Sequence, residues 1–197
     1  GDGAAASAAR LSAPEAVAVL AGGHVLIADT GLARVRVVNV GTGTVTVGPV
    51  SVGAGQIATV AGTVTSATAL LAPTGVVRSA GLLFVADTAT HRVWQVTIAT
   101  GATAAFAGNG GQGATGDNGP ATSAQLDQPQ GLALDASGTL YLADRGNSRV
   151  RVVNRQATTQ SFHGVSIAAG DIATVVSGSG GPGSLVDAML RAAGMTN

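Results

Sequence analysis

The chain lacks several residue types, and each absence excludes a class of protein. It has no cysteine, which excludes disulfide bonds and thiolate metal sites. Only 10% of its 197 residues are charged, against roughly a quarter in ordinary soluble domains. All ten basic residues are arginine, and ten acidic residues balance them. No basic stripe therefore predicts binding to the phosphates of nucleic acid.

Long apolar runs are also missing, although 46% of the residues are hydrophobic. Gly, Thr or Arg interrupts every apolar stretch well before the roughly 20 residues that a bilayer span needs. The apolar residues are therefore expected to build a core, and no membrane insertion is expected.

One segment occurs three times, at residues 25–39, 82–96 and 140–154. Each copy places an aspartate after an apolar run and an arginine five residues later. The pairs are Asp29 with Arg34, Asp87 with Arg92, and Asp144 with Arg149. Recurrence of this kind indicates one supersecondary unit stacked several times. Because the pair recurs in every copy, we interpret it as structural, with the carboxylate accepting from turn amides and pairing with the arginine.

The third copy predicts four short strands, at residues 131–134, 140–143, 149–153 and 171–176, with turn residues between them. Four antiparallel strands form one blade of a β-propeller. Successive side chains on a strand point to opposite faces. Burial between blades is therefore expected for Val35, Val37, Val150 and Val152, and exposure for Arg36 and Arg151.

A longer-range repeat relates residues 1–62 to residues 116–177 without a gap. Both segments carry an insertion, at 43–52 and 160–167, that the middle copy lacks. Alternation of Val with Thr or Ser predicts an extra hairpin in each. Its apolar side chains have no evident core within their own blade, so they form the candidate partner surface: Val50, Val52, Val165 and Ile167.

These repeats predict an all-β fold, a partial β-propeller of about three four-stranded blades. The expected boundaries are 1–62 for blade 1, 63–108 for blade 2, 109–178 for blade 3, and 179–197 for the start of a further blade or a tail. Three blades leave open edges and faces that need cover. We therefore expect contact with further blades of the same chain, other copies, or a larger assembly.

Three segments of the third copy resemble the NHL-repeat family of β-propellers: residues 116–126, 129–135 and 140–153. The Gly-Asp-x-Gly-Pro-Ala loop is similar to the long-form repeats of bacterial secreted and surface proteins and of teneurin-type propellers. The resemblance implies protein recognition or scaffolding more than catalysis. It implies an extracellular or cell-surface location.

Catalytic and cofactor motifs are weak by comparison. His24, His91 and His163 have no zinc-ligand spacing. Residues 108–113 fit Gly-x-Gly-x-x-Gly, but no helix pattern follows to hold a pyrophosphate. Asp117 and Asn118 offer calcium some oxygen ligands, though too few. No catalytic residue, cofactor or metal is assigned.

We therefore expect a non-enzymatic binding or structural module of a secreted or cell-surface protein. Two alternatives stay open. One is a segment of a propeller enzyme, a lyase or hydrolase, and the other is an extracytoplasmic sensor domain.

Overall fold

The computed structural model describes residues 1–62 and 70–177. The expected start of a further blade or tail at 179–197, and the first residues of blade 2 at 63–69, lie outside these residues. The chain forms two compact units. One comprises Gly1–Ala89 with Trp94–Ala104, and the other comprises Thr90–Val93 with the chain from Ala105 onward.

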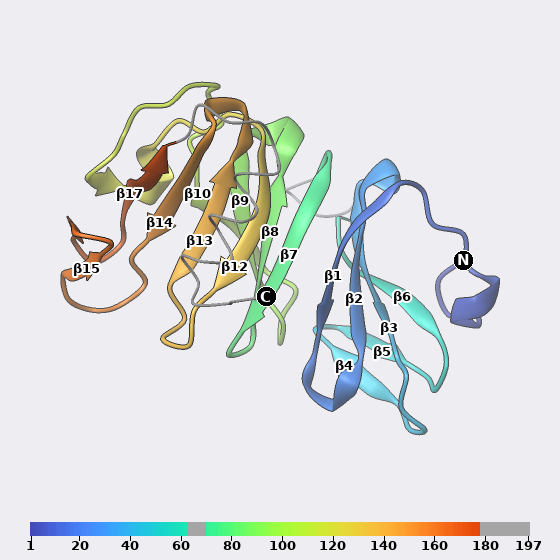
Figure 1. The fold of residues 1–197 in the computed structure, drawn as a ribbon. Helices are drawn as coiled ribbons and strands as arrows, with labels where there is room; N and C mark the ends of the chain where they lie inside the picture. Colours follow the sequence, from blue (N-terminus) through green and yellow to red (C-terminus); the bar gives the residue numbers. More distant parts are fainter. Residues whose placement is uncertain (63–69, 178–197) are drawn as a thin grey trace. The chain divides into compact units, whose positions relative to one another are not determined.

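Three larger sheets carry the fold (Figure 1). The first has the order β1-β2-β3-β6, with strands at Pro14–Val19, Val25–Asp29, Arg34–Val38 and Ile57–Ala61. The second has the order β10-β9-β8-β7, with strands at Thr103–Ala107, Arg92–Thr97, Leu82–Asp87 and Pro73–Ser79. The third has the order β11-β17-β14-β13-β12, with strands at Gly119–Pro120, Asp171–Ser177, Arg149–Val153, Leu140–Asp144 and Pro129–Leu134. These sheets are the blades that the repeats predict.

Two short hairpins form separate two-stranded sheets. In the first sheet's insertion, β4 (Val45–Val47) pairs with β5 (Val50–Val52). In the third sheet's insertion, β15 (Gln160–Phe162) pairs with β16 (Val165–Ile167). The predicted hairpins are therefore present, each between the third and fourth long strands of its blade.

The remaining regular elements are single 3₁₀ turns, named η1 to η6. They lie at Ala6–Ala8, Ala21–Gly23, Thr30–Leu32, Thr88–Thr90, Ala121–Ser123 and Arg145–Asn147. In each repeat, the turn after the aspartate is followed by a residue with left-handed backbone: Ala33, His91 and Ser148, with φ of 51° to 52°. This conformation reverses the chain so that the arginine strand pairs with the aspartate strand.

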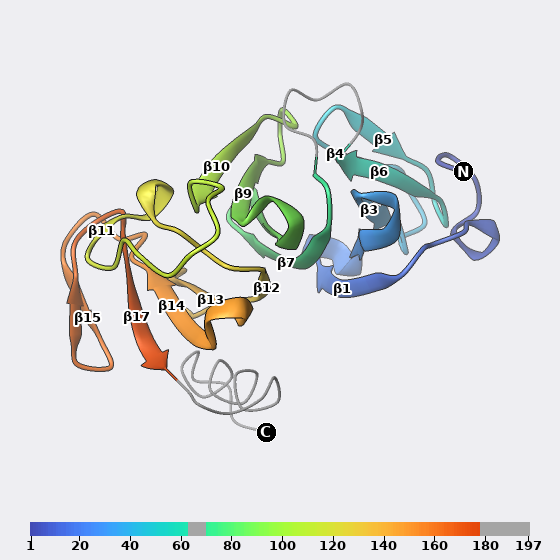
Figure 2. The same ribbon diagram turned by 90° about the horizontal axis from the view of Figure 1, so that it is seen from above.

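The core of the first unit lies between its two sheets, where β1 and β7 run side by side (Figure 2). Val35 and Val37 from β3 are fully buried there together with Val85 from β8. In the other unit, Val150 and Val152 of β14 are also fully buried. The burial expected for these valines is confirmed.

The exposure expected for Arg36 and Arg151 is wrong, since both side chains are 0% exposed. The alternation along each strand is as predicted, because the arginines do point away from the valines. The face that receives them, however, is covered by the loop that carries the Gly-Asp motif of the same repeat. The contacts that this burial creates are described below.

Candidate functional site

The repeated aspartates are fully buried at the ends of β2, β8 and β13. Each accepts hydrogen bonds from backbone N–H groups just before the first strand of its blade. Asp29 accepts from Ser12, Asp87 from Leu71 and Ala72, and Asp144 from Asp127, at 2.7–2.9 Å. The carboxylates therefore fix the entry of the chain into each blade, a structural role that recurs because every blade needs it.

The arginine five residues later has different partners in the three copies. Arg92 Nη2 donates to the Asn109 carbonyl at 2.6 Å. Arg34 Nε lies 3.0 Å from Asp29 Oδ2, as an ion pair. Arg149 sits opposite Asp144 in the β13–β14 register, but its Nη1 donates to the carbonyl of Ala114. Among the described side chains, Asp144 instead contacts Asn147 at 2.8 Å and Arg151 at 3.7 Å.

The environment of Asp144 disfavours its charge. Burial raises the pKa of this carboxyl above its ordinary value. Hydrogen bonds from Asn147 and from the Asp127 amide, together with the Arg151 charge, offset only part of that effect. Asp144 is therefore held in place mainly by its hydrogen bonds, and the cation beside it is Arg151.

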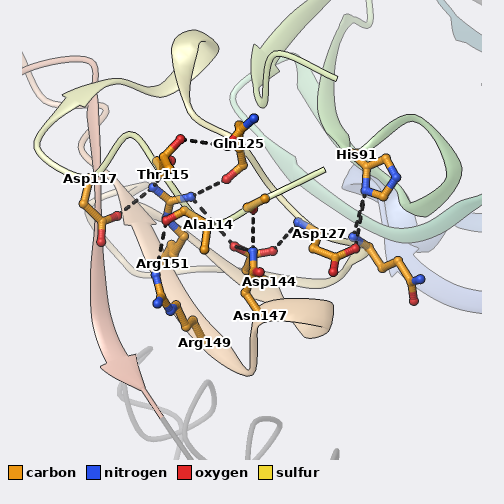
Figure 3. A network of polar contacts seen from close by, with 12 residues as sticks. His91, Ala114, Thr115, Asp117, Gln125, Asp127, Asp144, Asn147, Arg149 and Arg151 are labelled. Carbon is orange, nitrogen blue, oxygen red and sulfur yellow. Dashed lines mark hydrogen bonds and ion pairs between the residues drawn. The ribbon is translucent and has the colours of Figure 1, made fainter. Parts of the chain in front are cut away.

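Arg151 is the centre of a polar network that binds the Gly-Asp loop to β14 (Figure 3). One Nη donates to Asp117 Oδ1 at 2.6 Å and to the Thr115 carbonyl at 3.4 Å. The other Nη donates to the Gln125 carbonyl at 2.8 Å. A buried arginine is tolerable only when it is paired and hydrogen-bonded, and the loop supplies those partners.

The first repeat builds the same arrangement from equivalent residues. Arg36 Nη2 donates to Asp2 Oδ1 at 2.6 Å, and Nη1 donates to the Arg10 carbonyl at 3.2 Å. Partial burial raises the pKa of Asp2, but hydrogen bonds from Thr59 and Arg36 outweigh this effect and lower the pKa below its usual value. We call each set, Asp2 with Arg36 and Asp117 with Arg151, the loop clamp.

Two buried asparagines attach the inserted hairpins. Asn39 Nδ2 donates to the Gly43 and Val52 carbonyls, and Asn154 Nδ2 donates to those of Thr158 and Ile167. Sequence analysis missed the asparagines and the loop clamp. Their signal was available, because Asp2, Arg36 and Asn39 recur at the same spacing as Asp117, Arg151 and Asn154.

The candidate partner surface on these hairpins needs correction. Val52 and Ile167 are each only 1% exposed, and they belong to the cores of their units. Val50 and Val165 are half-buried and pack against the same cores. Because each asparagine holds its hairpin down, the valines and the isoleucine have a core after all, and they do not form an open surface.

Metal and cofactor chemistry finds little support in the part of the chain that the structure describes. Within residues 1–62 and 70–177, no three His, Asp or Glu side chains gather where they could hold a metal ion. The Asp117 carboxylate contacts the Arg151 guanidinium, and a calcium ion would have to share it with that cation. In the glycine-rich 108–113 loop, the Asn109 side chain accepts a hydrogen bond from the Gly111 amide and donates one to the Ser123 carbonyl. These bonds hold the loop in place.

The most exposed apolar side chains of the first sheet lie on the face of β1 that points away from β7. Ala16 and Ala18 pack into the shared core, whereas Val17 and Val19 are 69% and 64% exposed. Leu11, just before the strand, is 39% exposed. We call Leu11, Val17 and Val19 the β1 face.

The next repeat shows what the β1 face looks like when it is covered. Leu70 and Val76 stand in the same places relative to Pro73 as Leu11 and Val17 do relative to Pro14. They are 3% and 4% exposed, because β7 packs against the first sheet. The β1 face therefore corresponds to a surface that a neighbouring sheet covers in the next repeat, and none of the sheets within residues 1–62 and 70–177 covers it.

The helices of the described residues are single turns, and none has the length and hydropathy to cross a bilayer.

Comparisons with known proteins agree with this geometry. Residues 126–153, which run from Leu126 to the end of β14, match the NHL repeat family. A stretch of 91 residues, 40% of the chain, is 36% identical to human teneurin-1 and 35% identical to the mouse protein. The match covers 3% of the length of each of these relatives.

Two solved structures are similar at lower identity. An auxiliary nutrient binding protein from Bacteroides thetaiotaomicron superposes with a TM-score of 0.50 at 17% identity, over 69% of this chain and 36% of that one. A virginiamycin B lyase from Staphylococcus aureus gives 0.48 at 11% identity, over 75% of this chain and 40% of that one. At 17% identity the likeness to the nutrient binding protein concerns the fold alone, and it assigns no activity. The family match thus identifies an NHL repeat at residues 126–153, and the antiparallel sheets with their repeated Asp and Arg positions are the blades of a β-propeller.

Proposed function

We propose that this chain is a non-enzymatic binding and structural module whose β1 face docks another blade of the same kind. The observation that carries the proposal is the contrast within the first unit. Val17 is 69% exposed, whereas Val76 at the same place in the next repeat is 4% exposed beneath the neighbouring sheet. The internal repeat thus identifies the chemistry of the occupant, which is an apolar sheet face like the one that covers Val76.

Three further observations support a binding role. The repeated charged residues are engaged in the loop clamps and blade entries, which are structural. A propeller blade buries its faces only against neighbouring blades. The NHL repeat also supports a role with protein partners. The proposal includes a secreted or cell-surface parent protein, the location that the sequence resemblance implies.

A single cysteine provides the test, because the chain contains none. Val17→Cys places a thiol on the β1 face, and Ser51→Cys places one on the exposed side of the β4–β5 hairpin. In the full parent protein or its assembly, we expect a maleimide to label position 51 rapidly and position 17 at least about tenfold more slowly. Equal labelling of both thiols in the assembled protein would show that nothing docks on the β1 face.

A further inference from the structure

An open cavity of about 180 Å³ lies in the first unit, and none of its lining residues belongs to the β1 face, the loop clamps or the repeated aspartates. Its walls come from η2, the β4–β5 hairpin, the β7–β8 turn and the end of β9. The lining is mostly apolar, with two basic side chains: Leu20, Ala21, His24, Val45, Thr46, Val47, Arg78, Gly81 and Ile98. An apolar cavity of about 150 Å³ holds a ligand as large as benzene, so this one accommodates a small ring or a branched aliphatic group.

Arg78 supplies the cavity with an unused charge. It is exposed on β7 and makes no hydrogen bond or ion pair with the described residues. The arginines of the loop clamps, by contrast, each have several partners. A guanidinium beside apolar walls is the usual partner of a carboxylate, which it binds through two parallel N–H donors.

His24 supplies a second polar group without a partner. Its Nδ1 is buried and has no hydrogen-bond partner within residues 1–62 and 70–177. A buried polar atom that lacks a partner destabilises a protein by about 1 to 3 kcal/mol, so its retention calls for a reason. His24 is also one of the residues that line the cavity.

The internal repeats act as a control for what the fold itself needs. Arg78 corresponds to Val19 in the first blade and to Leu134 in the third, and His24 corresponds to Thr139. Thr139 is fully buried and bonded within its own turn, where its amide donates to Asp135. The blade fold therefore requires neither Arg78 nor His24, and both residues line this cavity.

We propose that the cavity binds a small organic acid, with its apolar body against Val45, Val47 and Ile98 and its carboxylate on Arg78. This inference is independent of blade docking at the β1 face, because the two surfaces share no residue.

The test uses sodium benzoate as the probe, with neutral benzamide as its uncharged match. Titration of the ¹⁵N-labelled chain is expected to shift the amides of Arg78, Gly81 and Ile98 with a Kd in the millimolar range or tighter. Arg78→Gln should weaken benzoate binding at least about tenfold, which corresponds to a loss of about 1.4 kcal/mol in binding free energy. Arg10→Gln, which removes an exposed arginine outside the cavity, should leave it unchanged.

Ala21→Leu provides a second variant that acts on shape instead of charge. Residue 21 is exposed at the cavity wall, so a larger side chain should block the cavity without unfolding the chain. Loss of benzoate binding in both Arg78→Gln and Ala21→Leu, with folded spectra, supports the proposal. Equal binding of benzamide and benzoate, unchanged binding in Arg78→Gln, or no shift at tens of millimolar benzoate overturns it.

A peptide that ends in phenylalanine, as free acid and as amide, tests the source of the carboxylate. Tighter binding of the free-acid peptide than of benzoate would overturn the small-molecule assignment.

Discussion

Replacing Arg151 by methionine is expected to lower the free energy of unfolding by about 3 to 5 kcal/mol, the loss that follows when one partner of a buried ion pair is removed. The arginine is fully buried and donates to Asp117 and to the carbonyls of Thr115 and Gln125. Methionine keeps much of the volume but offers none of these donors. The Gly-Asp loop would then lose its attachment to β14, and Asp144 would lose the cation beside it.

Arg149→Met is the matched control, because it removes an arginine two residues away on the same strand. Arg149 is half-buried, and its side chain makes one hydrogen bond to the described part of the chain, to the Ala114 carbonyl at 3.2 Å. Its replacement should lower the free energy of unfolding by less than about 1.5 kcal/mol. The free energies of unfolding of both variants are measured by urea titration, with circular dichroism as the signal. Similar losses in the two variants would mean that the loop clamp is not a principal support of the blade.

Leu126→Ala is expected to destabilise the chain by about 2 to 5 kcal/mol, as for other leucines removed from a closed core. Leu126 is 0% exposed, and its Cδ1 lies so close to Gly108 that a Cβ there would come within 3.0 Å. The alanine would leave a cavity, because Gly108 is held by its own backbone conformation, with φ of +88°.

The equivalent leucine of the first repeat makes the comparison specific. Leu11 precedes Pro14 by three residues, as Leu126 precedes Pro129, but it is 39% exposed on the β1 face. At concentrations low enough that the chain is monomeric, Leu11→Ala should change the free energy of unfolding by less than about 0.5 kcal/mol. In urea titrations, the loss of unfolding free energy should therefore be several-fold larger for Leu126→Ala than for Leu11→Ala. A large loss from Leu11→Ala in the isolated chain would show that this leucine is already covered.

Sequence periodicity was enough to predict the blades. The alternation in residues 149–153 places Val150 and Val152 in the core, and the turn residues after Asp144 mark the end of β13. Sequence periodicity was not enough to predict that Arg151 is buried. Alternation identifies which side chains share a face of a strand, but what covers that face depends on a loop more than thirty residues away, at Asp117.

The prediction that the hairpin side chains form a partner surface was wrong for a related reason. Val52 and Ile167 have an alternating pattern that fits an exposed ribbon as well as a covered one. Whether they are buried is decided by Asn39 and Asn154, whose amide groups bind the hairpin carbonyls. The open cavity at Arg78 could not be predicted from local pattern either, because it needs β4, β7 and the end of β9 to meet in space.

The mass of residues 1–197 in solution tests the central claim most directly, since an uncovered blade face should find another sheet face. The chain has a mass of 18.9 kDa. Light scattering across a range of concentrations is predicted to give a larger and concentration-dependent mass for the wild-type chain, and one close to 18.9 kDa for the Val17→Thr, Val19→Thr double variant, whose changes are confined to exposed positions. A cooperatively melting wild-type chain of 18.9 kDa at every concentration, indistinguishable from the double variant, would contradict the claim that the β1 face is a contact surface.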